Sequence, residues 1–123
     1  MKHLSRFAKS VSFSTRGIAK AWREEPNFRL EIIAALAVIL LAGLLRIDAG
    51  DLALIIFCCA IVLALELVNT MIEAISDMLK PRLNQYVKDI KDLTAAAVAI
   101  AALGSLGVAA CLLVPPMIAF FWR

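Results

Sequence analysis

Three long apolar runs, with most of the charged residues lying between them, constrain the fold of this chain most strongly. Each run is near the roughly 20 residues that an α-helix needs to cross a bilayer. Hydrophobic residues make up 63% of the sequence, whereas an ordinary soluble domain is roughly 45–50% apolar. We therefore expect a single all-α membrane domain over residues 1–123, with transmembrane helices at 29–46, 52–79 and 92–114.

The segment before the first run has the pattern of a helix that lies on the membrane surface. At about 100° per residue its apolar and basic side chains fall on opposite faces. The apolar face holds Leu4, Phe7, Ala8, Val11, Ile18 and Trp22, and the basic face holds Arg6, Lys9, Arg16, Lys20 and Arg23. Such a helix suits the membrane interface, so residues 1–25 are predicted to form a surface helix. Phe13 falls on the basic face, where an aromatic ring needs a ligand or another helix as its partner.

The basic residues predict the orientation of the chain in the membrane. Of the 13 Lys and Arg residues, seven precede the first apolar run and four lie between the second and third runs. The positive-inside rule then places the N-terminus and the 80–90 loop in the cytoplasm, and the 46–51 loop and the C-terminus outside. Nucleic acid is a poor partner for a chain that is mostly embedded. The charge fits anionic lipid head groups or a phosphorylated ligand better.

The expected connections follow from the residues between the runs. The short 46–51 segment predicts that the first two spans are antiparallel neighbours. Pro81 is expected to stop the second helix, and Pro115-Pro116 the third. Three cysteines lie within apolar runs without metal-binding spacing, and we interpret them as small hydrophobic residues.

A stripe of polar side chains runs along the second helix. Its members are Glu66, Asn69, Glu73 and Asp77. Spacings of 3, 4 and 4 place all four on one helix face. A carboxylate inside an apolar run, as at Glu66, is a functional hypothesis by default. Because Glu73 lies about 10 Å nearer the cytoplasm, the stripe could join a lipid head group to a water-soluble ligand.

An alternative is that this stripe forms a ladder of salt bridges that holds an oligomer together. Lys91, Arg29 and Arg23 could provide the basic partners. A small transporter and a structural membrane subunit also remain open, since both can carry carboxylates in a span.

Further acids and bases are predicted on the same side of the membrane. They are Glu24, Glu25, Arg29, Glu31, Lys91 and Asp92. Clustered acids with Lys and Arg suit a nucleotide bound through a divalent cation, because Mg²⁺ prefers one or two carboxylates together with substrate phosphates. The sequence has neither a Gly-rich phosphate loop nor the catalytic-loop signature of soluble kinases.

Three motifs in order resemble the small prokaryotic lipid kinases, the diacylglycerol and undecaprenol kinases. The segment Glu66-Leu-Val-Asn69-Thr-Met-Ile-Glu73-Ala-Ile-Ser-Asp77 is similar to the family pattern E-x-x-N-[ST]-x-[IV]-E-x-x-x-D. Lys91-Asp92 before an alanine-rich span is the second motif. Gly17-Ile-x-x-Ala21-Trp22-x-x-Glu25-x-x-Phe28-Arg29 is the third. The resemblance covers about residues 6–112.

This resemblance implies a homotrimer in the bacterial inner membrane, with active sites shared between subunits. It implies transfer of the γ-phosphate of MgATP to a lipid hydroxyl, with Glu66 as the general base and Glu25 and Glu73 as metal ligands. Residues implied around ATP are Arg6, Phe13, Glu25, Asn69, Glu73, Asp77, Arg82, Asn84, Lys91 and Asp92. Residues implied on the lipid side are Arg6, Trp22, Glu31 and Glu66.

The sequence departs from the diacylglycerol kinase pattern at several positions. Phe13 stands where a tyrosine is frequent, and Arg82-Leu-Asn84 replaces a Glu-Tyr-His stretch. Glu31 resembles the diacylglycerol kinase branch, whereas Asn69-Thr70 and Asn27-Phe28 look closer to the undecaprenol kinase branch. We expect diacylglycerol as the acceptor, with undecaprenol as the alternative.

Overall fold

The computed structural model describes residues 2–79 and 84–122, with side chains described from Arg6 and, after the gap, from Gln85. This part of the chain forms four helices and no strand: α1 (Lys2–Glu24), α2 (Pro26–Leu44), α3 (Ala49–Leu79) and α4 (Asn84–Phe121). The last three are long and apolar enough to cross a membrane. The predicted fold class, a surface helix followed by three spans, is confirmed.

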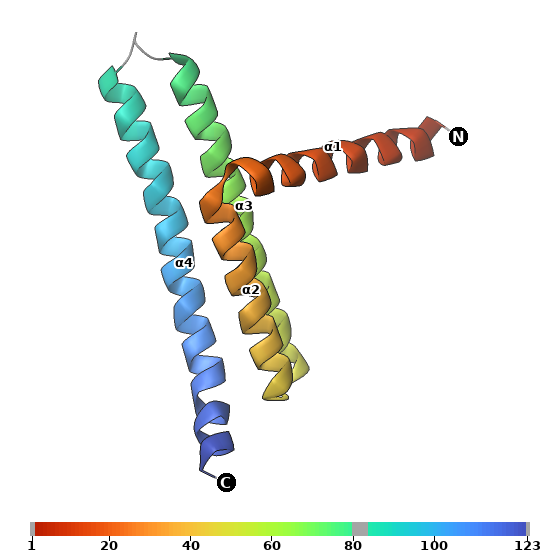
Figure 1. Cartoon of the computed structure of the whole chain (residues 1–123), viewed down its shortest axis with the longest axis vertical. Helices are drawn as coiled ribbons and strands as arrows, with labels where there is room; N and C mark the ends of the chain where they lie inside the picture. The colour runs from red at the N-terminus through yellow and green to blue at the C-terminus, as the bar shows by residue number, and fades with distance from the viewer. Residues whose placement is uncertain (1, 80–83, 123) are drawn as a thin grey trace.

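Helix α3 is the common neighbour of the other two spans. It packs against α4 most extensively and against α2 on another side, while α1 contacts α2. The three spans run alongside one another, and α1 leaves them at a steep angle (Figure 1). A small core of Ala42, Ile55 and Leu113 joins α2, α3 and α4. Most other large apolar side chains of the spans are exposed, as at Leu40 and Ile100, which suits contact with lipid.

A single extended residue separates α1 from α2. Glu25 has φ −107° and ψ 107°, and Pro26 occupies the first helical position of α2. Proline is favoured there because the missing N–H would have had no helical partner and the fixed φ already suits a helix. The first span therefore begins three residues before the predicted start at residue 29. This break allows the surface helix and the first span to point in different directions.

The turn from α2 to α3 closes with two backbone hydrogen bonds around Arg46. The Arg46 N–H donates to the Gly43 carbonyl at 3.2 Å, and the Ile47 N–H donates to the Ala42 carbonyl at 3.3 Å. This pair of bonds is the Schellman motif, in which the residue after the helix adopts the left-handed conformation. Arg46 does so with φ 52°. Glycine is the residue that usually fills this position.

Helix α4 extends beyond its predicted bounds of 92–114 at both ends. It begins at Asn84, so residues 84–90, predicted as loop, are helical. Val87 is 2% exposed, and the Gln85 side-chain amide donates to the Asp89 carboxylate one turn later at 3.0 Å. The burial of Val87 and this hydrogen bond both stabilise the first part of the helix.

The prediction that Pro115 and Pro116 end the third span is wrong, since α4 continues through them to Phe121. The two prolines remove two N–H donors but have a φ compatible with a helix. In a bilayer, ending the helix would leave more backbone groups without partners than continuing it, and prolines are tolerated in spans for this reason.

We predict that Arg46→Gly stabilises the protein. The left-handed conformation costs a non-glycine residue about 1–2 kcal/mol, and glycine removes this cost but gains entropy in the unfolded chain. The net gain should be about 1 kcal/mol and raise the unfolding temperature in detergent. Arg46→Ala is the matched control, because it removes the side chain but keeps the strain. Equal unfolding temperatures for the two variants would contradict the assignment of strain to this residue.

Candidate active site

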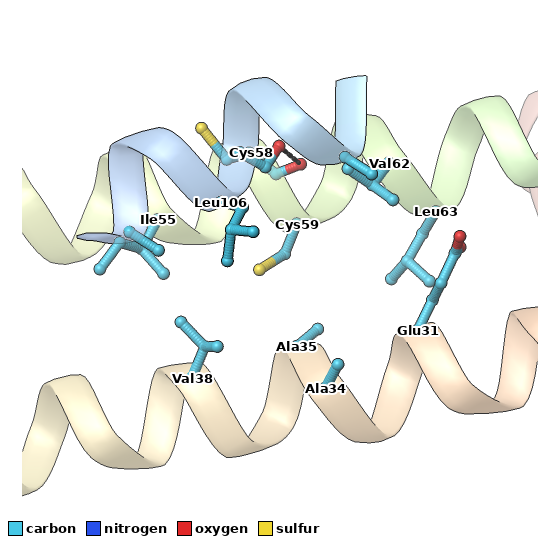
Figure 2. A pocket seen from close by; sticks show the side chains of 13 residues that line it. Glu31, Ala34, Ala35, Val38, Ile55, Cys58, Cys59, Val62, Leu63 and Leu106 are labelled. Carbon is cyan, nitrogen blue, oxygen red and sulfur yellow. Dashed lines mark hydrogen bonds between the residues drawn. The ribbon is translucent and has the colours of Figure 1, made fainter. Parts of the chain in front are cut away.

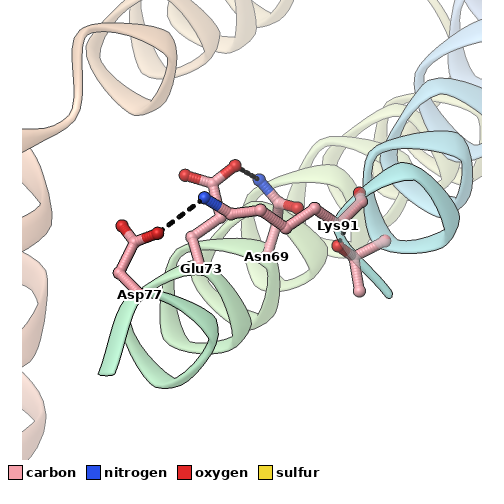
Figure 3. Close-up of polar contacts among 5 residues, drawn as sticks. Asn69, Glu73, Asp77 and Lys91 are labelled. Carbon is pink, nitrogen blue, oxygen red and sulfur yellow. Dashed lines mark hydrogen bonds and ion pairs between the residues drawn. The ribbon is translucent and has the colours of Figure 1, made fainter. Parts of the chain in front are cut away.

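The predicted polar stripe on α3 forms a continuous face that starts at a buried carboxylate. Glu66 is 5% exposed, deep within the apolar span. One turn further along the helix, the Asn69 side-chain amide donates to the Glu73 carboxylate at 3.5 Å, which is the outer limit of a hydrogen bond. Figure 3 shows Asn69, Glu73 and Asp77 in sequence along α3. The stripe therefore leads from the interior of the span toward the end of α3.

An ion pair joins the far end of the stripe to α4. The Lys91 ammonium donates to the Asp77 carboxylate at 3.0 Å (Figure 3). Lys91 is 27% exposed and Asp77 57% exposed, so water reaches this pair. The pair places a cation of α4 at the end of the stripe. A cation of this kind suits the phosphates of a ligand that arrives from water.

Four glutamates gather around the buried end of the stripe, and we call them the acidic cluster: Glu25, Glu31, Glu66 and Glu73. Glu66 lies close enough to Glu25 and Glu73 for their charges to repel, and Glu31 is repelled by Glu66 in turn. Glu25 lies at the break between α1 and α2, and its side chain does not cap α2, so its carboxylate is available to a ligand. Such crowding of like charges is unfavourable in the isolated chain and favours a bound cation.

Two buried oxygen atoms in this region have no hydrogen-bond partner among the described residues. They are Oε2 of Glu31 and Oδ1 of Asn69. A buried acceptor without a partner costs about 1–3 kcal/mol. Both atoms are available to a ligand, to water or to another chain.

The carboxylates fit a metal that is held jointly by protein and phosphate. Among residues 2–79 and 84–122, no three Asp, Glu, His or Cys side chains come close enough to hold a metal by themselves. Mg²⁺ in phosphoryl-transfer sites usually takes only one or two carboxylates, with phosphate oxygens and water as its other ligands. Glu25 and Glu73 provide donors of this type and number.

An apolar pocket of about 210 Å³ opens between α2, α3 and α4. Ala34, Ala35 and Val38 of α2 form one wall, and residues of α3 and α4 form the other (Figure 2). Glu31 stands at one end of the pocket. The walls are mostly small or apolar side chains, and a hydrocarbon chain is the ligand that such a surface suits.

Some predicted site residues lie apart from this cluster within one chain. Arg6, Phe13 and Trp22 are exposed on α1. The second half of α1 lines a shallow pocket together with residues of α3, whereas the N-terminal half extends away from the spans (Figure 1). Arg6 lies about 28 Å along the helix axis from Glu25. Phe13 is contacted by two cations, with Lys9 at 5.9 Å and Arg16 at 4.9 Å from the ring centre.

The remaining predicted residues lie at the start of α4 or just before it. Asp92 is exposed and follows Lys91. Asn84 is the first residue of α4, and its side chain is not described. Arg82 lies outside the described residues.

Sequence reasoning missed two polar residues in this region. Ser76 is 3% exposed on α3, three residues after Glu73, and that spacing could have placed it beside the stripe. The Ser105 hydroxyl donates to the Cys58 carbonyl at 3.5 Å across α3 and α4. Cys58, Cys59 and Cys111 are free, and the first two line the apolar pocket.

We predict that the ion pair between Lys91 and Asp77 adds little to stability. Water screens a partly exposed pair, and such pairs contribute about 0.2–1 kcal/mol. A double-mutant cycle with Lys91→Met and Asp77→Asn, followed by unfolding in detergent, should give a coupling energy below about 1 kcal/mol. A coupling of several kcal/mol would favour the salt-bridge ladder as the main role of the stripe.

Comparison with known proteins identifies a family. The family described as prokaryotic diacylglycerol kinase matches residues 12–113. A diacylglycerol kinase of Synechocystis is 33% identical over 110 residues, which cover 89% of this chain and 63% of the relative. That of Escherichia coli strain K12 is 33% identical over 97 residues, 79% of this chain and 80% of the relative. The diacylglycerol kinase of one Helicobacter pylori strain is 34% identical over 96 residues, which cover 78% of this chain and 75% of the relative. The chain belongs to the prokaryotic diacylglycerol kinase family.

Proposed function

We propose that this protein transfers the γ-phosphate of ATP to the hydroxyl of diacylglycerol and so produces phosphatidic acid. The observation that carries the proposal is the stripe on α3, which begins at buried Glu66 and ends at the water-exposed pair of Asp77 and Lys91. One end suits a lipid hydroxyl and the other a water-soluble nucleotide. Family membership and the shared name of the relatives support diacylglycerol as the acceptor.

Glu66 is proposed as the general base. Its carboxylate takes the proton of the lipid hydroxyl while that oxygen forms a bond to the γ-phosphorus. The bond from this phosphorus to the bridging oxygen breaks, and ADP leaves. A base must lie within hydrogen-bond reach of the proton that it accepts, and a lipid hydroxyl can reach a residue inside the span only through the membrane.

The nucleotide is proposed to bind at the other end of the stripe. Lys91 is a point charge suited to phosphate, and Asp77 holds its ammonium in place at 3.0 Å. Asn69 orients Glu73 through its amide and keeps a carbonyl oxygen without a partner among the described residues. Asp92, Arg82 and Asn84 are assigned to this side by motif position alone.

Glu25 and Glu73 would hold Mg²⁺ together with the phosphates. When bound, Mg²⁺ neutralises charge on the β- and γ-phosphate oxygens. The repulsion between these two carboxylates and Glu66 supports a cation there, because a cation relieves it.

The lipid side of the site is proposed to include Glu31, Trp22 and Arg6. Glu31 has a buried oxygen without a described partner at the end of the apolar pocket. This arrangement suits a polar lipid backbone next to a hydrocarbon chain.

A homotrimer with shared sites is part of the proposal. Within one chain α1 carries Arg6 and Phe13 away from the acidic cluster (Figure 1), so these residues would complete the site of another copy. The basic residues of α1 and of the segment around Lys91 support a cytoplasmic N-terminus in the inner membrane.

The test of the acceptor uses purified protein in mixed micelles with MgATP. Transfer of labelled γ-phosphate to diacylglycerol and, in parallel, to undecaprenol would be followed. Phosphatidic acid as the main product supports the proposal. Undecaprenyl phosphate would move the substrate to the second branch, which Asn69-Thr70 and Asn27-Phe28 favour. No product from either lipid with folded protein would contradict a lipid kinase.

We predict that Glu66→Gln lowers phosphoryl transfer by at least about 100-fold, the usual contribution of a general base. Glutamine keeps the size of the side chain and removes only the proton acceptor, so the unfolding temperature in detergent should not fall. Near-normal transfer by the folded variant would exclude Glu66 as the base.

We predict that Glu73→Gln raises the Mg²⁺ concentration needed for half-maximal activity, so added Mg²⁺ should restore part of the rate. Asp89→Asn is the matched control, because Asp89 is an exposed acid on α4 that bonds to Gln85 and lies off the stripe. An unchanged Mg²⁺ dependence in Glu73→Gln, or the same change in both variants, would argue against Glu73 as a ligand.

A further inference from the structure

The C-terminal end of α4 carries an apolar surface that nothing in the described chain covers. Leu113 is 5% exposed in the core of the three spans, and Met117 packs against the edge of that core. Beyond Met117 the exposed fractions rise steadily: Ile118 55%, Phe120 66%, Phe121 76% and Trp122 87%. The rings of Phe120 and Phe121 contact each other edge to face, with centres 5.7 Å apart. We call residues 118–122 the aromatic end of α4.

The aromatic end lies next to the polar turn between α2 and α3, at the opposite end of the bundle from the acidic cluster. Leu113 packs at the level of Ile55. Phe121 is eight residues, or about 12 Å, beyond Leu113, whereas Asp51 is four residues, or about 6 Å, beyond Ile55. Figure 1 shows α4 continuing past this turn. The rings therefore lie at the level of the charged residues of the turn or a few ångströms beyond them.

This level matches the border between hydrocarbon and water. The charged side chains of Arg46 and Asp48 in the turn and of Asp51 at the start of α3 cannot lie in the hydrocarbon core without a large cost, so they mark its edge. Trp is enriched at that edge, because its ring has an apolar body and an N–H for water or a head group. Phe side chains bury in the adjoining boundary between head groups and acyl chains. The aromatic end is continuous with the lipid-facing surface of α4, on which Ile100 and Leu103 are exposed.

We propose that Phe120, Phe121 and Trp122 anchor α4 in the lipid interface at the membrane face opposite the acidic cluster. The occupant of this surface is the boundary between lipid head groups and acyl chains. The two prolines just before it lack N–H donors, but α4 continues through them and carries the rings to this level. The proposal does not depend on the proposed function.

The anchor has a consequence at the other end of the same helix. Helix α4 is continuous from Asn84 to Phe121, so a fixed depth at its aromatic end also fixes the depth of Lys91. A shift of one residue would move the Lys91 backbone about 1.5 Å along the axis relative to Asp77, its partner at 3.0 Å.

The test uses the fluorescence of Trp122 in the full chain. The sequence contains two tryptophans, and Trp22→Phe leaves Trp122 as the only one. The protein is reconstituted into phosphatidylcholine vesicles that carry a doxyl quencher either near the carbonyl end or near the methyl end of the acyl chain, and aqueous iodide is added separately. None of these readouts requires catalytic activity.

We expect stronger quenching by the doxyl group near the carbonyl end, and iodide quenching several-fold weaker than for a free tryptophan derivative. Strong iodide quenching with red-shifted emission would place Trp122 in water and overturn the proposal. Stronger quenching by the deep doxyl group would place it in the hydrocarbon core, and insensitivity to all three quenchers would place it inside a contact between copies; either result also overturns the proposal.

A second variant tests the anchor beyond the position of one ring. Phe120→Ala with Phe121→Ala, in the Trp22→Phe background, should red-shift the emission of Trp122 and increase its quenching by iodide. Ile100→Ala is the matched control, because Ile100 is 72% exposed in the middle of the span and should leave Trp122 unchanged. Equal effects of the two changes, or no effect of the double change, would contradict a local aromatic anchor.

Discussion

The structure depends first on the absence of water in the bilayer core. Every backbone N–H and C=O group there must find a partner within the protein, and an unpaired group costs several kcal/mol. This requirement makes each span an unbroken helix and carries α4 through two consecutive prolines. It also confines every break to the edges, at Glu25, at the turn around Arg46 and between α3 and α4. The polar side chains that these breaks hold are thereby placed at the two surfaces of the membrane.

Among the three spans, α3 has two properties that oppose each other. It is the helix against which both other spans pack, and it carries Glu66, a buried carboxylate with other acids nearby. A core designed for stability alone would place an apolar side chain there, since buried charge is costly. The chain instead places several carboxylates close together at one end of the bundle. This arrangement distinguishes the site from an ordinary packing surface, and the proposal of a bound cation rests on it.

The sequence predicted the spans and the stripe because both depend on local periodicity. Glu66, Asn69, Glu73 and Asp77 share a face in any α-helix, so their alignment required no knowledge of packing. The start of α4 was missed because residues 84–90 are polar, and their helix is held by burial of Val87, which is a tertiary contact. The end of α4 was missed because a rule for proline from water-exposed helices was applied to a span.

The arrangement around the site was less predictable. Lys91 was recognised as a basic residue available to the stripe, but its contact with Asp77 depends on how α4 packs on α3. The pocket beside Glu31 is formed by three helices and has no signature in any one of them. The positions of Arg6 and Phe13 relative to the acidic residues depend on the direction that α1 takes from the break at Glu25, which the local sequence pattern does not give.

Because the chain breaks at Glu25, a tilt of α1 would turn the helix about a point close to the acidic cluster. A group at this point would move very little when α1 tilts on the membrane surface, so Glu25 would stay close to its position. Arg6, about 28 Å from this point, would sweep about 5 Å for a tilt of about 10°. The same tilt would therefore leave Glu25 nearly in place and displace Arg6 most.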